Sequence, residues 1–89
     1  MKYNDLTEQV IKAFFKVYNA LGYGFLEKVY ENALFGELTR GGFSVERQSA
    51  IAVYFSKKVV GEYYADLVVN DLLIIEIKAH ECLLVEHEN

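Results

Sequence analysis

The sequence predicts an α+β fold, in which two N-terminal helices pack on a mainly antiparallel sheet formed by the remaining residues. Apolar residues recur at spacings of three and four up to about residue 40, which is the period of a helix. From residue 43 the period changes to two, and short polar segments separate the apolar runs, as in strands joined by tight turns. With 89 residues, the chain is expected to form a single domain, residues 1–89.

The first helix is predicted to begin with Asn4 or Asp5 as its N-cap and to end at Gly22-Tyr23-Gly24. Its inner face is formed by Leu6, Val10, Ala13 or Phe14, Val17 and Leu21. Ile11, Phe15 and Tyr18 make a second apolar stripe beside that face. A helix this broadly apolar is expected to be covered on two sides, by the sheet and by another helix or subunit.

The second helix is predicted from about Phe25 to Arg40, and Gly41-Gly42 stops it. Its inner face is expected to contain Leu26, Val29 or Tyr30, Ala33 and Leu38. Glu27 has two interpretations. With Gly24 as the N-cap, Glu27 occupies the third helical position and offsets the helix dipole. Alternatively, Glu27 points toward an acidic cluster on the sheet.

Three strands are predicted to form a meander. Phe43 to Phe55 forms one long strand, or two strands broken near Gln48-Ser49. Val59 to Val69 follows the polar turn at residues 56–58, with Gly61 as a possible bulge. Leu72 to Lys78 comes after Asn70-Asp71 and reads as a strand buried on both faces, since its apolar residues do not alternate with polar ones.

The candidate site is an acid-acid-base set on the last two of these strands. Glu76 interrupts the apolar run, and a buried carboxylate must be paired, protonated or bound to a metal. Lys78 lies two residues on and projects from the same face, while Asp66 lies one strand back. This set could hold a divalent cation and position a water against a phosphate.

The loop between these strands decides whether the two carboxylates meet. A two-residue loop at Asn70-Asp71 would place them on opposite faces of the sheet, because side chains alternate with period two. A loop of residues 70–72 puts Asp66 opposite Glu76, whereas a loop of residues 69–71 puts it opposite Ile74. We therefore predict one of the two three-residue loops, or a bulge near Asp66.

Composition excludes several classes of protein. The net charge is −4 and the pI is near 5.1, so any contact with nucleic acid requires a bound cation or a local basic patch. Arg47 and Lys57-Lys58 supply such a patch, unless they are solvated surface and turn residues. The single cysteine, Cys82, favours a reducing cytoplasm. No apolar run is long enough for a membrane span, so no membrane partner is expected.

The C-terminal residues, 80–89, are polar and are expected to contain no strand. Candidate metal ligands among them are Glu81, Glu86, His87 and Glu88, although their spacing alone does not show a metal site.

Four blocks of the sequence, in order, resemble a known family. Gly24 to Tyr30 reads as G-x-x-E-x-x-Y, and Glu46-Arg47-Gln48 follows it. The third block is residues 62–69 and the fourth is residues 75–79, with E-x-K at its centre. Together they are similar to the GxxExxY proteins, a branch of the PD-(D/E)xK nuclease-like superfamily, over nearly the whole chain.

The resemblance implies a restriction-endonuclease-like core, in which a further strand makes the sheet mixed. It implies that Asp66 and Glu76 hold Mg²⁺ or Mn²⁺ and that Lys78 helps to activate the attacking water. The backbone carbonyl of Ile77 is a third candidate metal ligand. The resemblance also adds Glu27 to the site, so that this residue both caps its helix and contributes to catalysis.

Related proteins continue with a helix and a strand, so we expect this core to be truncated at its C-terminus. The apolar surface left bare, with the two stripes of the first helix, predicts a homodimer or higher assembly. The expected function is metal-dependent phosphodiester cleavage in DNA or RNA. The alternative is a catalytically inactive relic or protein-interaction module that retains the fold.

Overall fold

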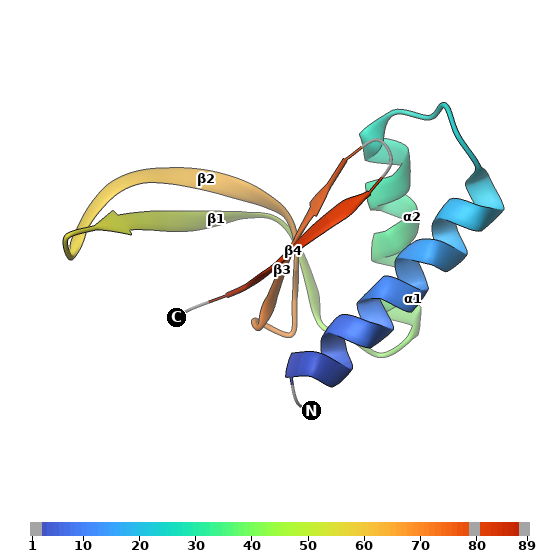
Figure 1. Cartoon of the computed structure of the whole chain (residues 1–89), viewed down its shortest axis with the longest axis horizontal. Coiled ribbons are helices and arrows are strands. Elements are labelled where there is room, and N and C mark those ends of the chain that lie inside the picture. The colour runs from blue at the N-terminus through green and yellow to red at the C-terminus, as the bar shows by residue number, and fades with distance from the viewer. Residues whose placement is uncertain (1–2, 79–80, 88–89) are drawn as a thin grey trace.

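The computed structural model describes residues 3–78 and 81–87. Two helices come first, α1 (Tyr3–Leu21) and α2 (Glu27–Arg40), followed by four strands. The strands are β1 (Val45–Phe55), β2 (Lys58–Val69), β3 (Leu73–Ile77) and β4 (Cys82–Glu86). Figure 1 shows the helices gathered at one end of the molecule, while β1 and β2 extend away from them as a long two-stranded ribbon.

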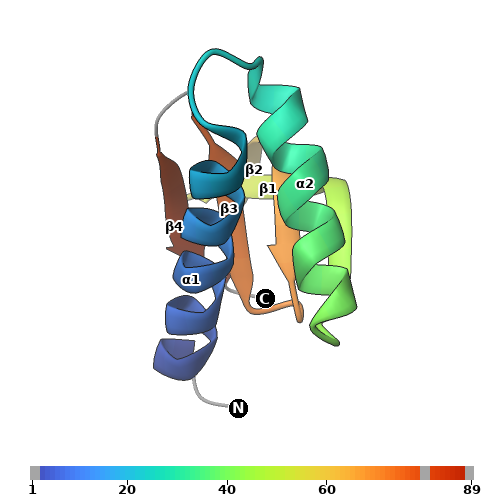
Figure 2. The same ribbon diagram turned by 90° about the vertical axis from the view of Figure 1, so that its right-hand side faces the viewer.

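The architecture confirms the predicted α+β fold class. The strands lie in the order β1-β2-β3-β4, and each neighbouring pair is antiparallel. Among the described residues the sheet is therefore antiparallel throughout, where a mixed sheet was expected. Figure 2 shows both helices on one face of this sheet, with α1 over β3 and β4 and α2 beside it.

The core lies between the helices and the sheet. It contains Leu6, Val10, Phe14 and Val17 from α1, Tyr30, Leu34 and Leu38 from α2, and Leu67, Val69, Leu73, Ile75 and Ile77 from the strands. The α1 residues are those that the helical spacing predicted. Tyr30 also donates a hydrogen bond from its hydroxyl to the carbonyl of Gly22, and so ties α2 to the end of α1.

The helix starts differ from the sequence-based expectation. Helix α1 begins at Tyr3, so Asn4 and Asp5 lie in its first turn rather than capping it. Helix α2 has Leu26 as its N-cap, and Leu26 makes no side-chain capping bond. Glu27 is consequently the first helical residue, not the third, although it still lies at the positive end of the helix dipole. Leu26, predicted on the inner face, is 79% exposed.

The strands β1 and β2 form a ribbon that is regular except at two points. Gln48 has φ +51°, which marks the position where the sequence suggested a break in the first strand. Near the tip, Val53 pairs with Gly61 and Tyr54 pairs with Val59, so Val60 is the extra residue of a bulge. The predicted bulge at Gly61 is therefore displaced by one residue.

The turn between β2 and β3 has the length that the site requires. Val69 pairs with Leu73, which leaves the three residues 70–72 in the loop. Asn70 and Asp71 have φ of +52° and +55°, a left-handed conformation that Asn and Asp tolerate better than most residues. Asn70 is held by Ser44, whose N–H donates to Oδ1 at 2.9 Å and whose carbonyl accepts from the Asn70 N–H at 2.7 Å.

The C-terminal residues form an unpredicted strand. Cys82–Glu86 pairs with β3, whose second edge would otherwise remain unpaired. The expectation of a polar segment without a strand is therefore wrong, because Cys82 to Val85 is an apolar run of strand length. The second stripe of α1 is only partly covered, because Ile11 is 38% exposed and Phe15 is 55% exposed. Self-association through this stripe remains a prediction.

Candidate metal and catalytic site

The structure brings Asp66 and Glu76 together across β2 and β3. The pairs Val69–Leu73, Val68–Ile74 and Leu67–Ile75 fix the register up to Leu67 and leave residues 70–72 in the loop, which is one of the two predicted loop lengths. Beyond these pairs the contact is made by side chains: Asp66 reaches the N–H of Ile77, the residue next to Glu76, and the charge of Asp66 acts on Glu76. The two carboxylates therefore lie close enough to repel each other when both are ionised.

Asp66 takes over a hydrogen bond that backbone pairing would otherwise make. The N–H of Ile77 donates to Asp66 Oδ2 at 2.7 Å, and the backbone ladder between β2 and β3 stops at Leu67. The carboxylate is thereby fixed at the end of β3, beside the backbone of Ile77. The carbonyl of Ile77, predicted as a third ligand, remains a proposal.

Glu76 is poorly satisfied without a cation. Its Oε2 is enclosed by protein and has no hydrogen-bond partner among the described residues. Burial raises the pKa of Glu76 above its ordinary value, the charge of Asp66 raises it further, and the charge of Lys78 opposes both. A buried, unpaired oxygen beside a second carboxylate is a donor set that suits a hard divalent cation. The residues therefore fit the predicted metal.

Lys78 and Glu27 lie differently with respect to this pair. Lys78 is exposed just beyond β3, and its charge lowers the pKa of Glu76; its role in the site stays a prediction. Glu27 is exposed at the start of α2. Within residues 3–78 and 81–87, no three His, Cys, Asp or Glu side chains are close enough to hold a metal together. Glu27 is therefore not gathered with the two carboxylates in this conformation.

The C-terminal candidates form no such cluster either. Glu81, Glu86 and His87 lie within the described residues, and none of them belongs to a group of three potential metal ligands there. His87 instead lies with Nε2 3.5 Å from Asp71 Oδ1, an interaction that is ionic only when the histidine is protonated. The fourth candidate, Glu88, lies outside the described residues.

Sequence reasoning missed Glu31, the one charged residue that is buried in the described part of the chain. Its carboxylate accepts from Lys28 Nζ at 3.0 Å, from Gln48 Nε2 at 3.2 Å and, more weakly, from Arg47 Nη2 at 3.4 Å. A signal for it was present: Glu31 lies three positions before Leu34 and seven before Leu38, on the apolar face of α2.

The basic residues do not form one patch. Arg47 lies at the base of the ribbon, where its guanidinium binds Glu31 and Asn32 and stacks 4.7 Å from the centre of the Phe35 ring. Lys57 and Lys58 lie at the far tip of the ribbon. Of the two interpretations, a single Arg47–Lys57–Lys58 patch is therefore wrong, because the length of β1 separates its members.

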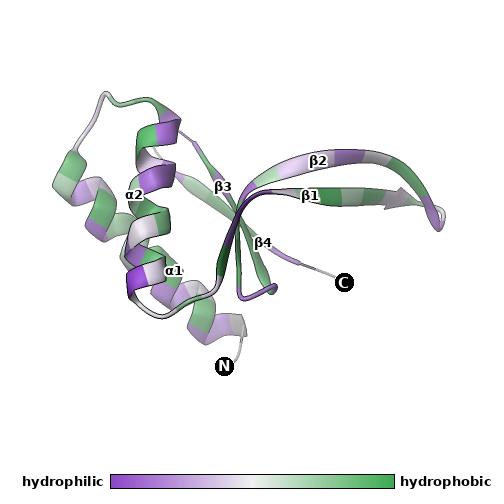
Figure 3. Ribbon diagram, turned by 180° about the vertical axis from the view of Figure 1, so that it is seen from behind, coloured by the Kyte–Doolittle hydropathy of each residue, from purple (hydrophilic) through white to green (hydrophobic). Residues whose placement is uncertain are grey.

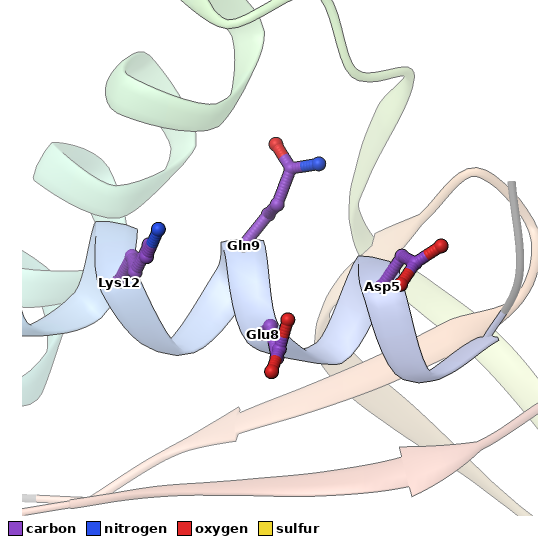
Figure 4. Close-up of a pocket in the computed structure, with 4 residues that line it drawn as sticks. All are labelled: Asp5, Glu8, Gln9 and Lys12. Atoms are coloured by element: carbon purple, nitrogen blue, oxygen red, sulfur yellow. The ribbon is translucent and has the colours of Figure 1, made fainter.

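The side chains of Asp5, Glu8, Gln9 and Lys12 border an open hollow on α1 (Figure 4). All four come from one helix and fan outward instead of converging on a common point. The hollow contains none of the residues of the acidic pair. We therefore assign the chemistry to the sheet and not to this hollow.

The raised pKa of Glu76 gives a prediction about stability. The folded protein binds a proton at Glu76 more tightly than the unfolded chain, so stability is lost as pH rises through the folded pKa. In EDTA, Glu76→Gln should raise the melting temperature at pH 7, and the gain should disappear as pH falls toward about 4, where the unfolded carboxyl is also protonated.

Thermal melts across this pH range measure the effect. Glu62→Gln is the matched control, since it removes the same charge from an exposed position on β2. An equal gain from both variants would attribute the effect to net charge and contradict a local repulsion at Glu76.

Comparison with known proteins supports a family assignment. Residues 4–89 match the family model described as the PD-(D/E)XK nuclease superfamily, which is nearly the whole chain. Comparisons with curated proteins and with solved structures gave no match. In the described part of the chain, no helix is long and apolar enough to cross a membrane. On the extent of the family match, the chain belongs to the PD-(D/E)XK nuclease superfamily.

Proposed function

We propose that the protein is a phosphodiesterase that cleaves DNA or RNA with the help of Mg²⁺ or Mn²⁺. Membership of the superfamily supports a nuclease-like function. The observation that carries the proposal is the Asp66–Glu76 pair, in which Asp66 is held beside Glu76 by the Ile77 N–H and one Glu76 oxygen is buried without a partner among the described residues. Within the superfamily, Gly24, Glu27 and Tyr30 favour the GxxExxY branch.

Each residue of the site has a proposed task. Asp66, Glu76 and the Ile77 carbonyl would hold the cation, which supplies charge stabilisation to the phosphate and lowers the pKa of a bound water. The Ile77 N–H fixes the orientation of Asp66. Lys78 would orient the attacking water or stabilise charge that develops on the phosphate. Glu27 would join only through a closer approach of the first turn of α2.

The ribbon is the proposed contact for the substrate backbone. Lys57 and Lys58 project at its tip and form no ion pair within the described residues, in a chain whose net charge is −4. The ribbon also exposes aromatic side chains that could stack on bases, namely Tyr54, Phe55 and Tyr64. Figure 3 shows that apolar residues continue along the ribbon, far from the core. Strand β2 runs from the tip of the ribbon to Asp66, so a single nucleic-acid chain could contact both the tip and the site.

The single cysteine agrees with a cytoplasmic location, which we retain as part of the proposal. Cys82 is a free thiol on β4, and burial raises its pKa above the ordinary value. A half-buried thiol of raised pKa remains protonated at neutral pH and is a poor nucleophile. Cys82 is therefore assigned no catalytic task.

The metal site predicts a cation-dependent stabilisation. Millimolar Mn²⁺ should raise the melting temperature of the wild type, because the cation binds the folded protein and relieves the repulsion between the carboxylates. Asp66→Ala and Glu76→Ala should each abolish the rise. Lys78→Ala should keep the rise and lose cleavage of plasmid and single-stranded substrates, since its task is chemical.

The combination of melts and cleavage separates the two candidate functions. Cleavage that needs Mn²⁺ and Lys78 supports the enzyme. A metal-dependent shift without cleavage would favour a site that persists in an inactive interaction module. A wild type whose melting temperature ignores Mn²⁺ and Mg²⁺ would contradict the metal site itself.

The ribbon predicts a dependence on substrate length. Lys58 precedes Asp66 by eight positions, so the tip lies up to about 26 Å from the site, roughly the length of eight base pairs. A variant with Lys57→Ala and Lys58→Ala should raise KM for substrates longer than this and leave kcat unchanged. Its slope of log affinity against log salt should fall by up to about 2, as two phosphate contacts are lost.

The matched control carries Lys12→Ala and Lys16→Ala on α1, which make the same change in net charge on the helical face. Substrates shorter than about eight base pairs should bind both variants like the wild type. Equal losses in the two double variants, or equal losses on short and long substrates, would contradict a contact at the tip.

A further inference from the structure

Asp66 lies at a gap in the backbone ladder on both sides of β2. The pairs of β1 with β2 include Leu67 and Ala65 but omit Gln48 and Asp66, which stand opposite each other between them. The pairs of β2 with β3 stop at Leu67. The ladder therefore does not determine the position of Asp66 by itself, and other contacts must do so.

Gln48, across the gap from Asp66, is held in an unusual conformation. Its φ of +51° lies in the left-handed region, which residues with a side chain seldom adopt unless the surroundings impose it. A side-chain hydrogen bond accompanies this conformation: Gln48 Nε2 donates to Glu31 Oε1 at 3.2 Å and lies 3.5 Å from Oε2. The side-chain amide of Gln48 is thus bound to the helix layer.

The Glu31 carboxylate that binds this amide is itself buried and held by other donors. Glu31 is 4% exposed, and Lys28 and Arg47 also donate to its carboxylate. Arg47 is fixed in turn by Asn32 and by the ring of Phe35. Every partner of the Glu31 carboxylate therefore comes from α2 or from the base of β1, which joins these two elements beside Asp66.

We propose that Glu31 and Gln48 are positioning residues, which set the place of Asp66 relative to Ile77 and Glu76. Glu31 orients Gln48, the left-handed turn at Gln48 shapes β1 opposite Asp66, and Asp66 then meets the N–H of Ile77. The role in catalysis rests on the proposed function, but the positioning itself is a property of the metal-free protein. The competing interpretation is that Glu31 merely ties α2 to β1.

Hydrogen exchange of the Ile77 amide in metal-free protein tests the proposal, because this amide reports on the bond to Asp66. Glu31→Ala should accelerate its exchange about tenfold relative to the Leu67 and Ile75 amides, because loss of the contact lowers the free energy of local opening at Asp66. Gln48→Gly should do the same, although glycine accepts φ +51° without strain. The double variant should add no more, since both residues act through one contact.

A second ionic cluster provides the control. Glu37 accepts from Lys16 at 2.8 Å and from Arg40 at 2.7 Å, and joins α1 to α2 without contacting β1. Glu37→Ala should leave Ile77 exchange unchanged relative to the core amides. Glu31→Gln keeps an acceptor for Gln48 and should largely retain slow exchange of Ile77. If Glu31→Ala folds poorly, Gln48→Gly provides the test.

Two results would overturn the proposal. One is Ile77 exchange that stays at the wild-type rate in Gln48→Gly and, where it folds, in Glu31→Ala. The other is acceleration that affects the Leu67 and Ile75 amides equally, because that is general loosening. Neither result depends on metal binding or cleavage, so failure of the positioning network is distinguishable from failure of the proposed function. If Asp66 and Glu76 bind Mn²⁺ as proposed, the Mn²⁺ affinity should fall roughly 10- to 100-fold in Glu31→Ala.

Discussion

The site depends on the register of β3 against β2, and a turn of three residues sets that register. Because side chains alternate across a strand, a turn one residue shorter would separate Asp66 and Glu76 onto opposite faces. Asn70 enforces the longer turn, since it takes a left-handed conformation and bonds to Ser44 on the segment that leads into β1. The hydrogen bonds between Ser44 and Asn70 at this turn thus help to set how Asp66 and Glu76 meet at the other end of β3.

Several features of the same region oppose folding. The ladder is interrupted at Asp66, Gln48 is held left-handed, and one Glu76 oxygen is buried without a partner. Each of these features opposes folding, and a left-handed residue or an unsatisfied polar atom typically costs about 1–3 kcal/mol. Their concentration around one pair of carboxylates agrees with the proposed site, since departures from local rules are expected to gather at functional sites.

Much of this arrangement could be predicted from local patterns. The inner face of α1 followed from spacing, and the meeting of Asp66 with Glu76 followed from alternation plus an odd turn. What failed depended on distant partners. Strand β4 forms because β3 offers a free edge to the apolar run from Cys82 to Val85, and Glu31 is buried because Arg47 and Gln48 come from another element to bind it. The apolar run and the position of Glu31 on the apolar face of α2 are visible in the sequence, but the partners that decide their structure are not.

The most direct test is a crystal structure of the protein with Mn²⁺, in which anomalous scattering locates the ion. We predict an anomalous peak between the side chains of Asp66 and Glu76. One oxygen of each should lie about 2.0–2.2 Å from the ion, a distance typical of small divalent cations with oxygen ligands. The absence of a peak there at millimolar Mn²⁺, or side chains of Asp66 and Glu76 on opposite faces of the sheet, would contradict it.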